Sequence, residues 1–511
     1  MAESAGSSPV TPEEHIVTSE TPEQASFSVG KHIHTVSLSQ TTLTWQRDNK
    51  KSAETNSARL QDLIAVDVKD ATTNEIRSKM AVVYVTQKKD FLLRRVQVTF
   101  DGERDRCEYF RRKMQEAIDT CKDRPRRLLV LINPVSGFST GVKKYRNVVA
   151  PIFEEAKLET DVIVTEKAHH TEEILATYDL KSINGLVIVS GDGMYHEAAN
   201  GLVRRVATDT GNDVNNPDYE PSEFPVTIGL IPCGTGNGIA RAAVGNYDIV
   251  SAAYSVILGH KWRNNLFSVF SNRKLVTYKS LLTGFGLWGD VIYSAEMRRS
   301  MGVLRYPVTL IERIFFKSFR RMSLTLKFRA PPEYSESNDN AFRTGGRDTA
   351  ENPEGESREI KSNTVHTADG MTTITEEFIA SMSFCNPFKS ITHVFIQPDY
   401  QPETAATDLL LCRPCTKMQF IKFITKFINF SDDFTENVNE KFPLVKVSEY
   451  EVTLNNASPP DTDAGRRERV MNVDGEPYHL EEPNFHVKLF PGRIPVFCNI
   501  PSVTCRPPPT K

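Results

Sequence analysis

Three short apolar segments, each ending at a glycine-containing loop, are the feature of this 511-residue sequence that most restricts its fold. The segments cover residues 128–132, 186–189 and 226–231, and continuous apolar runs of this length are typical of strands buried on both faces. The carboxyl ends of parallel strands open on one crevice, so we expect the three loops to converge on one nucleotide. The loops are Asn133-Pro134-Val135-Ser136-Gly137, Ser190-Gly191-Asp192-Gly193 and Gly234-Thr235-Gly236.

The middle loop carries an acidic residue, Asp192, between two glycines at the start of a predicted helix. Glycines permit a tight turn and a close approach of backbone amides to phosphate oxygens. A carboxylate beside phosphates must bind a cation or accept a proton from an attacking hydroxyl. Taken alone, Gly-Asp-Gly is better explained as an ordinary tight turn, and the two further loops favour the phosphate role.

These motifs together resemble the diacylglycerol-kinase-type catalytic domain, in its sphingosine kinase and ceramide kinase branch. The resemblance covers roughly residues 127–490, and neither a Walker P-loop nor the dinucleotide fingerprint is present. The motifs, in the order of the family, are Asn133-Pro134, Ser190-Gly191-Asp192-Gly193, Glu197, Asn200-Gly201, Gly234-Thr235-Gly236-Asn237 and Asp474-Gly475-Glu476.

The resemblance implies an α/β plus all-β fold class. We expect a doubly wound nucleotide-binding α/β domain over residues 127–260, where strand and helix patterns alternate. A β-rich, sandwich-like lipid-binding domain is expected over 261–495. Short alternating strands and a helix stripe at 107–118 predict a small PH-like β domain over 28–122. The polar segments 1–27 and 331–372 are interpreted as a disordered tail and a disordered insertion.

The resemblance also implies a role for each motif residue. Asp192 is expected to be the general base that takes the proton of a primary lipid hydroxyl, with Ser190, Gly191 and Gly193 beside the substrate. ATP is the expected cofactor, with Mg²⁺ carried by the phosphates rather than by a side-chain motif of its own. The residues expected at ATP are Asn133, Pro134, Val135, Thr165, Glu166, Lys167, Ala168, His169, Glu197, Gly234, Thr235, Gly236, Arg299, Arg305, Asp474, Gly475 and Glu476.

The lipid head group is expected at Asp290 and Ile292. Sphingosine kinases have an acidic residue where this chain has Ile292, and an ammonium buried without a carboxylate is costly. Residues 284–290 resemble ceramide kinases, whereas 231–240 and 197–202 resemble sphingosine kinases. Because the latter matches lie on the catalytic loops, we expect a kinase that makes sphingosine 1-phosphate, with ceramide as the alternative substrate. A catalytically silent membrane scaffold of the same fold is the third interpretation, against which the intact Asp192 argues.

Charge and composition restrict the partners. A net charge of −3 and a pI of about 6.5 give no reason to expect nucleic acid. No secretory signal or membrane-spanning window is present, and the eight cysteines do not form a disulfide scaffold. We therefore expect a cytoplasmic protein that is recruited peripherally to membranes, either monomeric or homodimeric. The aromatic stretches 418–428 and 315–319 could line an acyl channel or dip into a membrane. For the first stretch an ordinary core-facing helix is the favoured interpretation, and for the second the alternatives stay open.

Overall fold

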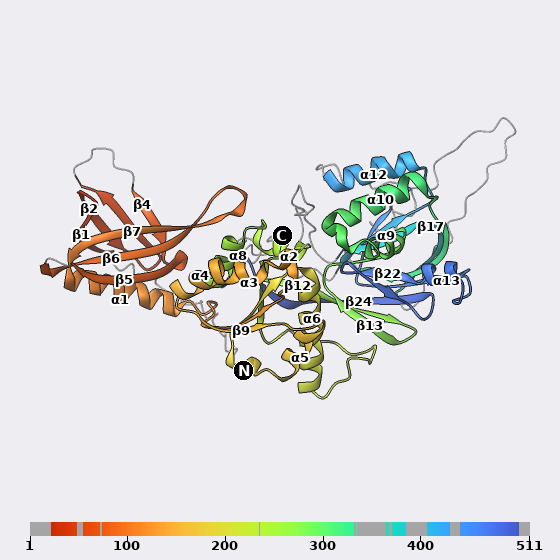
Figure 1. Cartoon of the computed structure of the whole chain (residues 1–511), viewed down its shortest axis with the longest axis horizontal. Coiled ribbons are helices and arrows are strands. Elements are labelled where there is room, and N and C mark those ends of the chain that lie inside the picture. Colours follow the sequence, from red (N-terminus) through yellow and green to blue (C-terminus); the bar gives the residue numbers. More distant parts are fainter. Residues whose placement is uncertain are drawn as a thin grey trace, which may run out of the picture. The chain divides into compact units, whose positions relative to one another are not determined.

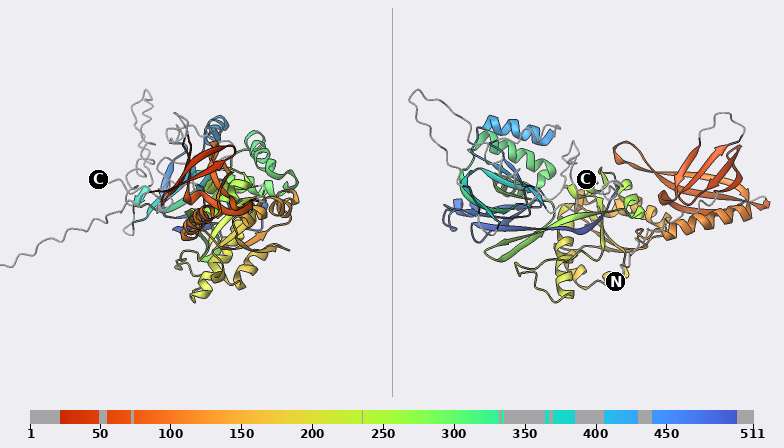
Figure 2. Two further views of the ribbon diagram at one scale, coloured as in Figure 1. Left: turned by 90° about the vertical axis from the view of Figure 1, so that its left-hand side faces the viewer. Right: turned by 180° about the vertical axis from the view of Figure 1, so that it is seen from behind.

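The computed structural model describes residues 22–48, 55–71, 74–234, 236–331, 334, 364–366, 370–384, 406–429 and 440–499. The chain divides into two compact units (Figures 1 and 2). The first unit comprises Met1–Thr86 and Arg95–Lys122, and the second comprises Gln87–Arg94 and Asp123–Lys511.

The first unit is an antiparallel sheet of seven strands followed by one helix, as expected for the small N-terminal β domain. Its strands lie in the order β4-β3-β2-β1-β7-β6-β5. Helix α1 buries Cys107, Phe110 and Met114, the stripe at helical spacing that the sequence predicts. The elements are β1 (Glu23–Val29), β2 (His32–Leu38), β3 (Thr42–Arg47), β4 (Asn56–Arg59), η1 (Leu60–Asp62), β5 (Leu63–Ala71), β6 (Asn74–Gln87), β7 (Leu93–Glu103) and α1 (Arg104–Thr120). The short η2 (Lys89–Phe91), between β6 and β7, belongs to the second unit.

Strand β1 lies inside the tail that we predicted over residues 1–27, so the end of that segment is corrected to before Glu23. The reason is the burial of Ala25 and Phe27, because the Phe27 ring packs edge-on against Phe100 and Phe110. Residues 1–21 of the predicted tail lie outside the described residues.

The α/β part of the second unit begins at Arg127 and contains four parallel strands in the order β11-β10-β8-β9. Helices α4 and α8 lie on one side of these strands, and α5 and α6 lie on the other (Figure 1). Strands β10 and β11 are buried throughout, which explains their continuous apolar sequence. The elements are β8 (Arg127–Ile132), α2 (Ser136–Ser139), α3 (Gly141–Lys144), η3 (Tyr145–Val149), α4 (Ala150–Glu155), β9 (Glu159–Val164), α5 (His170–Thr177), η4 (Leu180–Ser182), β10 (Gly185–Ser190), α6 (Asp192–Asp209), β11 (Thr227–Pro232), α7 (Gly238–Val244) and α8 (Ile249–Leu258).

The remaining residues form a β-sandwich. One layer has the order β16-β17-β15-β21-β24, and the other has the order β20-β19-β18-β14-β22-β23. Side chains of both layers share one core, including Leu324, Phe378, Phe285 and Leu411. The elements are β12 (Lys261–Ser271), β13 (Lys274–Lys279), β14 (Leu282–Gly286), α9 (Leu287–Glu296), η5 (Arg299–Leu304), α10 (Arg305–Phe316), β15 (Met322–Arg329), β16 (Thr364–His366), β17 (Thr372–Phe378), β18 (Ala380–Phe384), β19 (Thr407–Cys412), α12 (Lys417–Asn429), β20 (Leu444–Val447), β21 (Glu449–Leu454), α13 (Asp463–Glu468), β22 (Val470–Val473), β23 (Glu476–His479) and β24 (Asn484–Phe497).

Strand β24 belongs to both parts of the second unit. It pairs with β21 of the sandwich near its start and runs parallel to β11 of the α/β part at its end, where Val496 pairs with Ile228. The α/β strands and one sandwich layer are therefore one continuous sheet of eleven strands. The predicted fold class is confirmed. The sheet joins the regions 127–260 and 261–495, which we predicted as separate domains.

Two predicted segments of the sandwich region need comment. Most of the predicted insertion 331–372 lies outside the described residues, but residues 364–366 form β16, which pairs with β17. Helix α12 buries Phe420, Phe423 and Ile424 against α9 and the sandwich, so its described part packs on the core. Within the described residues no helix is long and apolar enough to span a bilayer.

Residues 87–94, from the last residue of β6 through η2 to the first two residues of β7, belong to the second unit rather than to the first. The side-chain amide of Asn246 donates to the Phe91 carbonyl at 3.0 Å, and Arg94 pairs with Asp248 at 2.7 Å. A methyl group at Gly245, whose φ is 90°, would clash with the Phe91 ring. These contacts attach the segment to the loop between α7 and α8.

Candidate active site

The three glycine loops meet, as the sequence predicts. Gly191 and Gly234 lie so close that a Cβ built on Gly191 would stand 2.9 Å from the Gly234 Cα. Gly137 has a φ of 54° and lies against the backbone of Cys233, where a Cβ would overlap the carbonyl oxygen. Only residues without a side chain permit this approach of three backbones. The glycines are therefore required by packing, independently of any ligand.

Hydrogen bonds join the same loops. The Ser136 hydroxyl donates to the Cys233 carbonyl at 3.3 Å, and the Ser190 hydroxyl lies 3.3 Å from that of Ser136. The side chain of Asn237 accepts from the Gly234 amide at 3.0 Å and donates to the Gly234 carbonyl at 2.8 Å. In the first loop, the Asn133 side chain accepts from the Val135 amide at 3.0 Å, which leaves Val135 exposed beyond Pro134. Thr235, which we predicted at ATP, lies outside the described residues.

Asp192 is the first residue of α6 and lies at the centre of these loops. Its carboxylate accepts hydrogen bonds from the backbone amides of Gly238 at 2.8 Å and Ile239 at 3.1 Å, at the start of α7. Burial raises the pKa of the Asp192 carboxyl, the two amides lower it, and the nearby charge of Asp474 raises it further, with a net increase. A carboxylate oxygen has two lone-pair directions, so each oxygen retains one for a hydroxyl proton.

The segment Thr165–His169 follows β9, beside the first glycine loop in the sheet order. Thr165 is buried, and its amide donates to the Ile132 carbonyl at 2.9 Å, whereas Glu166, Lys167, Ala168 and His169 are exposed. His169 has a φ of 60° and lies 3.1 Å from Glu172. Glu172 mainly, and Glu197 more weakly, raise the pKa of His169 against the opposing effect of burial. Glu197 therefore lies on the side of α6 that faces this segment.

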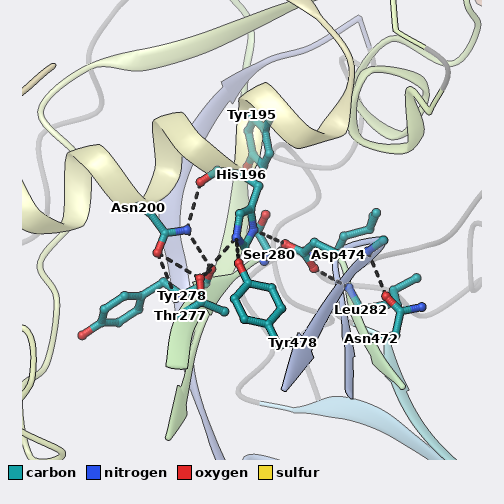
Figure 3. A network of polar contacts seen from close by, with 12 residues as sticks. Tyr195, His196, Asn200, Thr277, Tyr278, Ser280, Leu282, Asn472, Asp474 and Tyr478 are labelled. Atoms are coloured by element: carbon teal, nitrogen blue, oxygen red, sulfur yellow. Dashed lines mark hydrogen bonds and ion pairs between the residues drawn. The ribbon is translucent and has the colours of Figure 1, made fainter. Parts of the chain in front are cut away.

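The predicted Asp474-Gly475-Glu476 motif is the tight turn between β22 and β23, with φ values of 51° and 91° at its first two residues. The Asp474 carboxylate is directed inward, where it accepts from the amides of Ser280, Leu281 and Leu282 at 2.8–3.0 Å (Figure 3). Glu476 instead lies toward α6, since a Cβ at Gly193 would be 4.0 Å from its Oε1. The turn thus lies beside the Asp192 loop, but Asp474 binds the protein's own backbone.

The predicted head-group residues lie on α9. Asp290 is buried and faces two arginines, with its oxygens 3.9 Å from Arg313 Nη1 and 3.5 Å from Arg320 Nη2. Burial raises the pKa of Asp290 despite the opposing effect of these arginines. Ile292 is almost completely buried. The Asp290 carboxylate therefore already has cationic partners, and Ile292 has no carboxylate that could bind an ammonium group.

The two predicted phosphate arginines follow α9. Arg299 is the first residue of η5. Arg305 begins α10, where its Nη2 donates to the Tyr306 hydroxyl at 2.6 Å and its Nη1 lies 3.7 Å from Glu296. These contacts hold Arg305 on α9 and α10.

Sequence reasoning missed one residue of the site, His196, and quoted Asn200 as part of a motif without giving it a role. Together with Asp192 they occupy positions i, i+4 and i+8 of α6, one face of the helix. The Asn200 side chain accepts from the Tyr278 amide and donates to the Tyr278 carbonyl, each at 3.0 Å. The signal that could have identified them is the spacing of four residues that Asp192, His196 and Asn200 share, among the apolar residues of the first half of the helix.

A bound Mg²⁺ would need ligands other than a dedicated protein cluster. Among the described residues, no three His, Cys, Asp or Glu side chains are grouped to hold a metal. Mg²⁺ usually retains water and binds through substrate phosphates and one or two carboxylates. The residues present fit an ion that enters with the nucleotide.

Known proteins resemble this chain in sequence and in fold. Residues 127–269 match the diacylglycerol kinase catalytic domain. Ceramide kinase of Mus musculus is 26% identical over 82% of this chain and 81% of its own length. Sphingoid long-chain bases kinase 1 of Arabidopsis thaliana is 31% identical over 43% of this chain and 26% of its own length.

A solved structure, of a putative diacylglycerol kinase from Bacillus anthracis, superposes with a TM-score of 0.51 and 15% identity. It covers 75% of this chain and 99% of its own length, and it supports the two-domain fold alone. The sequence match includes β8, β10 and β11 with their three loops. The chain therefore contains a diacylglycerol kinase catalytic domain and is similar to proteins of the branch that contains the ceramide and sphingoid base kinases.

Proposed function

We propose that this chain transfers the γ-phosphoryl group of ATP to the primary hydroxyl of a sphingolipid. The observation that carries the proposal is the position of Asp192, a half-buried carboxylate held by two amides where three glycine loops meet. Phosphoryl transfer needs positioning and charge stabilisation more than covalent chemistry from the protein. Backbone amides of these loops would contact the phosphates, and Mg²⁺ bound with the nucleotide would neutralise their charge.

In this proposal Asp192 accepts the proton of the lipid hydroxyl as the hydroxyl oxygen bonds to the γ-phosphorus. The bond from that phosphorus to the bridging oxygen breaks, and ADP leaves with the electron pair. A carboxyl pKa above the ordinary value makes Asp192 a better proton acceptor near neutral pH. The same base, loops and nucleotide would serve either candidate lipid.

The head group that the geometry favours is an N-acylated one, of the ceramide type. A free-amine lipid brings a cation that needs a carboxylate. Asp290 is already paired with Arg313 and Arg320, and Ile292 is apolar and buried. The similarity to mouse ceramide kinase also extends over more of the chain than the similarity to the Arabidopsis sphingoid base kinase.

Sphingosine is the second candidate, and it is the one that the sequence analysis favoured. The sphingoid base kinase is the more identical of the two relatives over its shorter match, 31% against 26%. Of the two stretches that resemble sphingosine kinases, residues 197–202 lie on α6 and residues 231–240 include the loop after β11. A free amine would then require Asp290 to exchange an arginine for the substrate.

Access to the lipid is proposed through α10, whose outer face is apolar. Leu304, Val308, Ile311 and Phe315 follow one another at spacings of three or four residues and are exposed, with Ile311 52% exposed. Phe316 is 78% exposed at the end of the helix, next to Lys317. Contiguous exposed apolar side chains flanked by basic residues are typical of helices that lie in a membrane interface. Peripheral recruitment of a cytoplasmic protein fits this surface.

The test is a labelled-ATP assay of the purified chain against ceramide, sphingosine and diacylglycerol in mixed micelles, at saturating ATP and Mg²⁺. We expect phosphorylation of ceramide, with less or none of sphingosine. A preference for sphingosine would select the second candidate. The absence of labelled product from all three lipids would contradict the proposed function.

A further inference from the structure

A buried histidine joins the helix of Asp192 to the β-sandwich. His196 lies one turn after Asp192 on α6, and its Nδ1 is 3.1 Å from the Asp474 carboxylate (Figure 3). Its Nε2 is 3.1 Å from the Tyr478 hydroxyl and 3.2 Å from the Thr277 hydroxyl. A carboxylate only accepts, so Nδ1 is the donor to Asp474. Each nitrogen of the ring therefore has a partner outside α6: Nδ1 in the turn between β22 and β23, and Nε2 on β13 and β23.

Asp474 in turn fixes the connection between β13 and β14. Its Oδ1 accepts from the amides of Leu281 and Leu282, and its Oδ2 accepts from Ser280 and His196. All lone-pair directions of the carboxylate are thus used within the protein. If a buried carboxylate loses one of its hydrogen-bond partners, its remaining hydrogen bonds are less well fixed and the folded state is destabilised.

The connection that Asp474 holds lies against the amides that orient Asp192. A Cβ at Gly238 would stand 3.6 Å from the Leu281 side chain. The Gly238 amide donates to Asp192 at 2.8 Å. The contacts therefore form a closed path from Asp192 along α6 to His196, across to Asp474, and back through Leu281 to Gly238.

We propose that His196 and Asp474 are a pair of positioning residues that fix the Asp192 carboxylate relative to the sandwich part of the site. The inference rests on the proposed function and adds to it, since neither side chain needs to touch the reacting atoms. Asp474 thereby has a role in addition to the predicted nucleotide contact of its turn. A displacement of a catalytic group by about 1 Å can reduce turnover about a hundredfold, so such a pair would act mainly on kcat.

Charge gives the pair a second, measurable effect. Burial tends to raise the pKa of Asp474, but the contact with His196, the charge of Lys279 and the Ser280 amide outweigh it, so the carboxyl stays ionised. Its negative charge contributes to the raised pKa of Asp192. The titratable and charged groups that face Asp474 are Asp192, Tyr195 and His196 from α6, Lys279 from β13 and Tyr478 from β23.

Three substitutions of His196 separate the contacts of its two nitrogens. His196→Phe retains a ring and removes both, His196→Asn places an amide near the position of Nδ1, and His196→Gln places one near Nε2. We expect His196→Phe to lower kcat about tenfold or more with KM for ATP little changed, and His196→Asn to recover more of that loss than His196→Gln. If His196 only filled space, the kcat values of the three variants would not follow this order.

Asp474→Asn tests the charge. Removing the negative charge should lower the Asp192 pKa, so the acidic limb of the kcat profile should move to lower pH. A purely structural loss would reduce kcat at every pH and leave the limb in place. If Asp474→Asn does not fold, the His196 series still decides the question.

The matched control is His486→Gln, because His486 on β24 makes a similar contact with Glu449 on β21, Nε2 to Oε1 at 2.8 Å. It should leave kcat and the pH profile unchanged. If His196→Phe has the same kcat as the wild type and as His486→Gln, the proposed pair is refuted and the proposed function is unaffected. A wild-type chain inactive on every lipid of the panel would overturn both.

Discussion

At the scale of single residues, steric contact explains the glycines and electrostatics explains the acid. Gly191 and Gly234 are in backbone contact, whereas Gly193 has only the distant Glu476 oxygen near the place of a Cβ. All three glycines lie in the same kind of motif, so the sequence could not distinguish those that packing requires from the one that it does not. That distinction depends on which backbone atoms of another loop lie near each glycine.

Gly234→Ala is therefore expected to destabilise the chain, because its Cβ would lie 2.6 Å from the Gly191 amide nitrogen. Overpacking of this kind costs about 1–3 kcal/mol of the free energy of unfolding. Gly193→Ala is the control and should be neutral or stabilising, since alanine is favoured within a helix. Thermal unfolding measures both, and equal stability of the two variants would contradict this packing.

The raised pKa of Asp192 predicts how activity depends on pH. As a base, Asp192 must be ionised, so kcat should fall as the pH falls through its pKa. Because burial raises that pKa above the ordinary 3.8, the acidic limb should lie above pH 3.8. A kcat profile measured at saturating substrates, with protein stability verified at each pH, tests this. A flat profile down to pH 4 would mean that the limiting base is another group.

At the scale of elements, the local sequence pattern predicted where strands and helices form better than it predicted what covers them. Strands β8, β10 and β11 and the stripe of α1 follow directly from apolar periodicity. Helix α12 was predicted to face the core rather than a membrane, and its buried Phe420 agrees with that prediction. Periodicity identifies an apolar face but not what covers it, which depends on elements distant in sequence.

Helix α10 carries the prediction for membrane association. Ile311→Asp should reduce sedimentation with anionic vesicles and turnover of a vesicle-embedded lipid, because it places a charge on the exposed apolar face. Turnover of a short-chain lipid dispersed in detergent should change little. Ile33→Asp, at an isoleucine 57% exposed in the first unit, is the control. Equal vesicle binding by both variants would refute α10 as the membrane surface.

At the scale of the whole molecule, pairing between distant segments assembles the site. Strand β24, almost at the end of the described chain, joins the sandwich to β11. Asp474 reaches back to residues 280–282 and to His196. Neither pairing has a local signature, so the sequence alone could predict the glycine loops and Asp192 but not the His196–Asp474 contact.

The central claim is that Asp192 acts as the base at the meeting point of the three loops. Its most direct test compares wild type, Asp192→Asn and the control Asp209→Asn, an exposed residue at the end of the same helix, for single-turnover transfer of labelled phosphate to lipid. ATP affinity is measured in parallel. We predict a loss of about a hundredfold or more for Asp192→Asn alone, with ATP affinity retained. Transfer by Asp192→Asn at the wild-type rate would contradict the account.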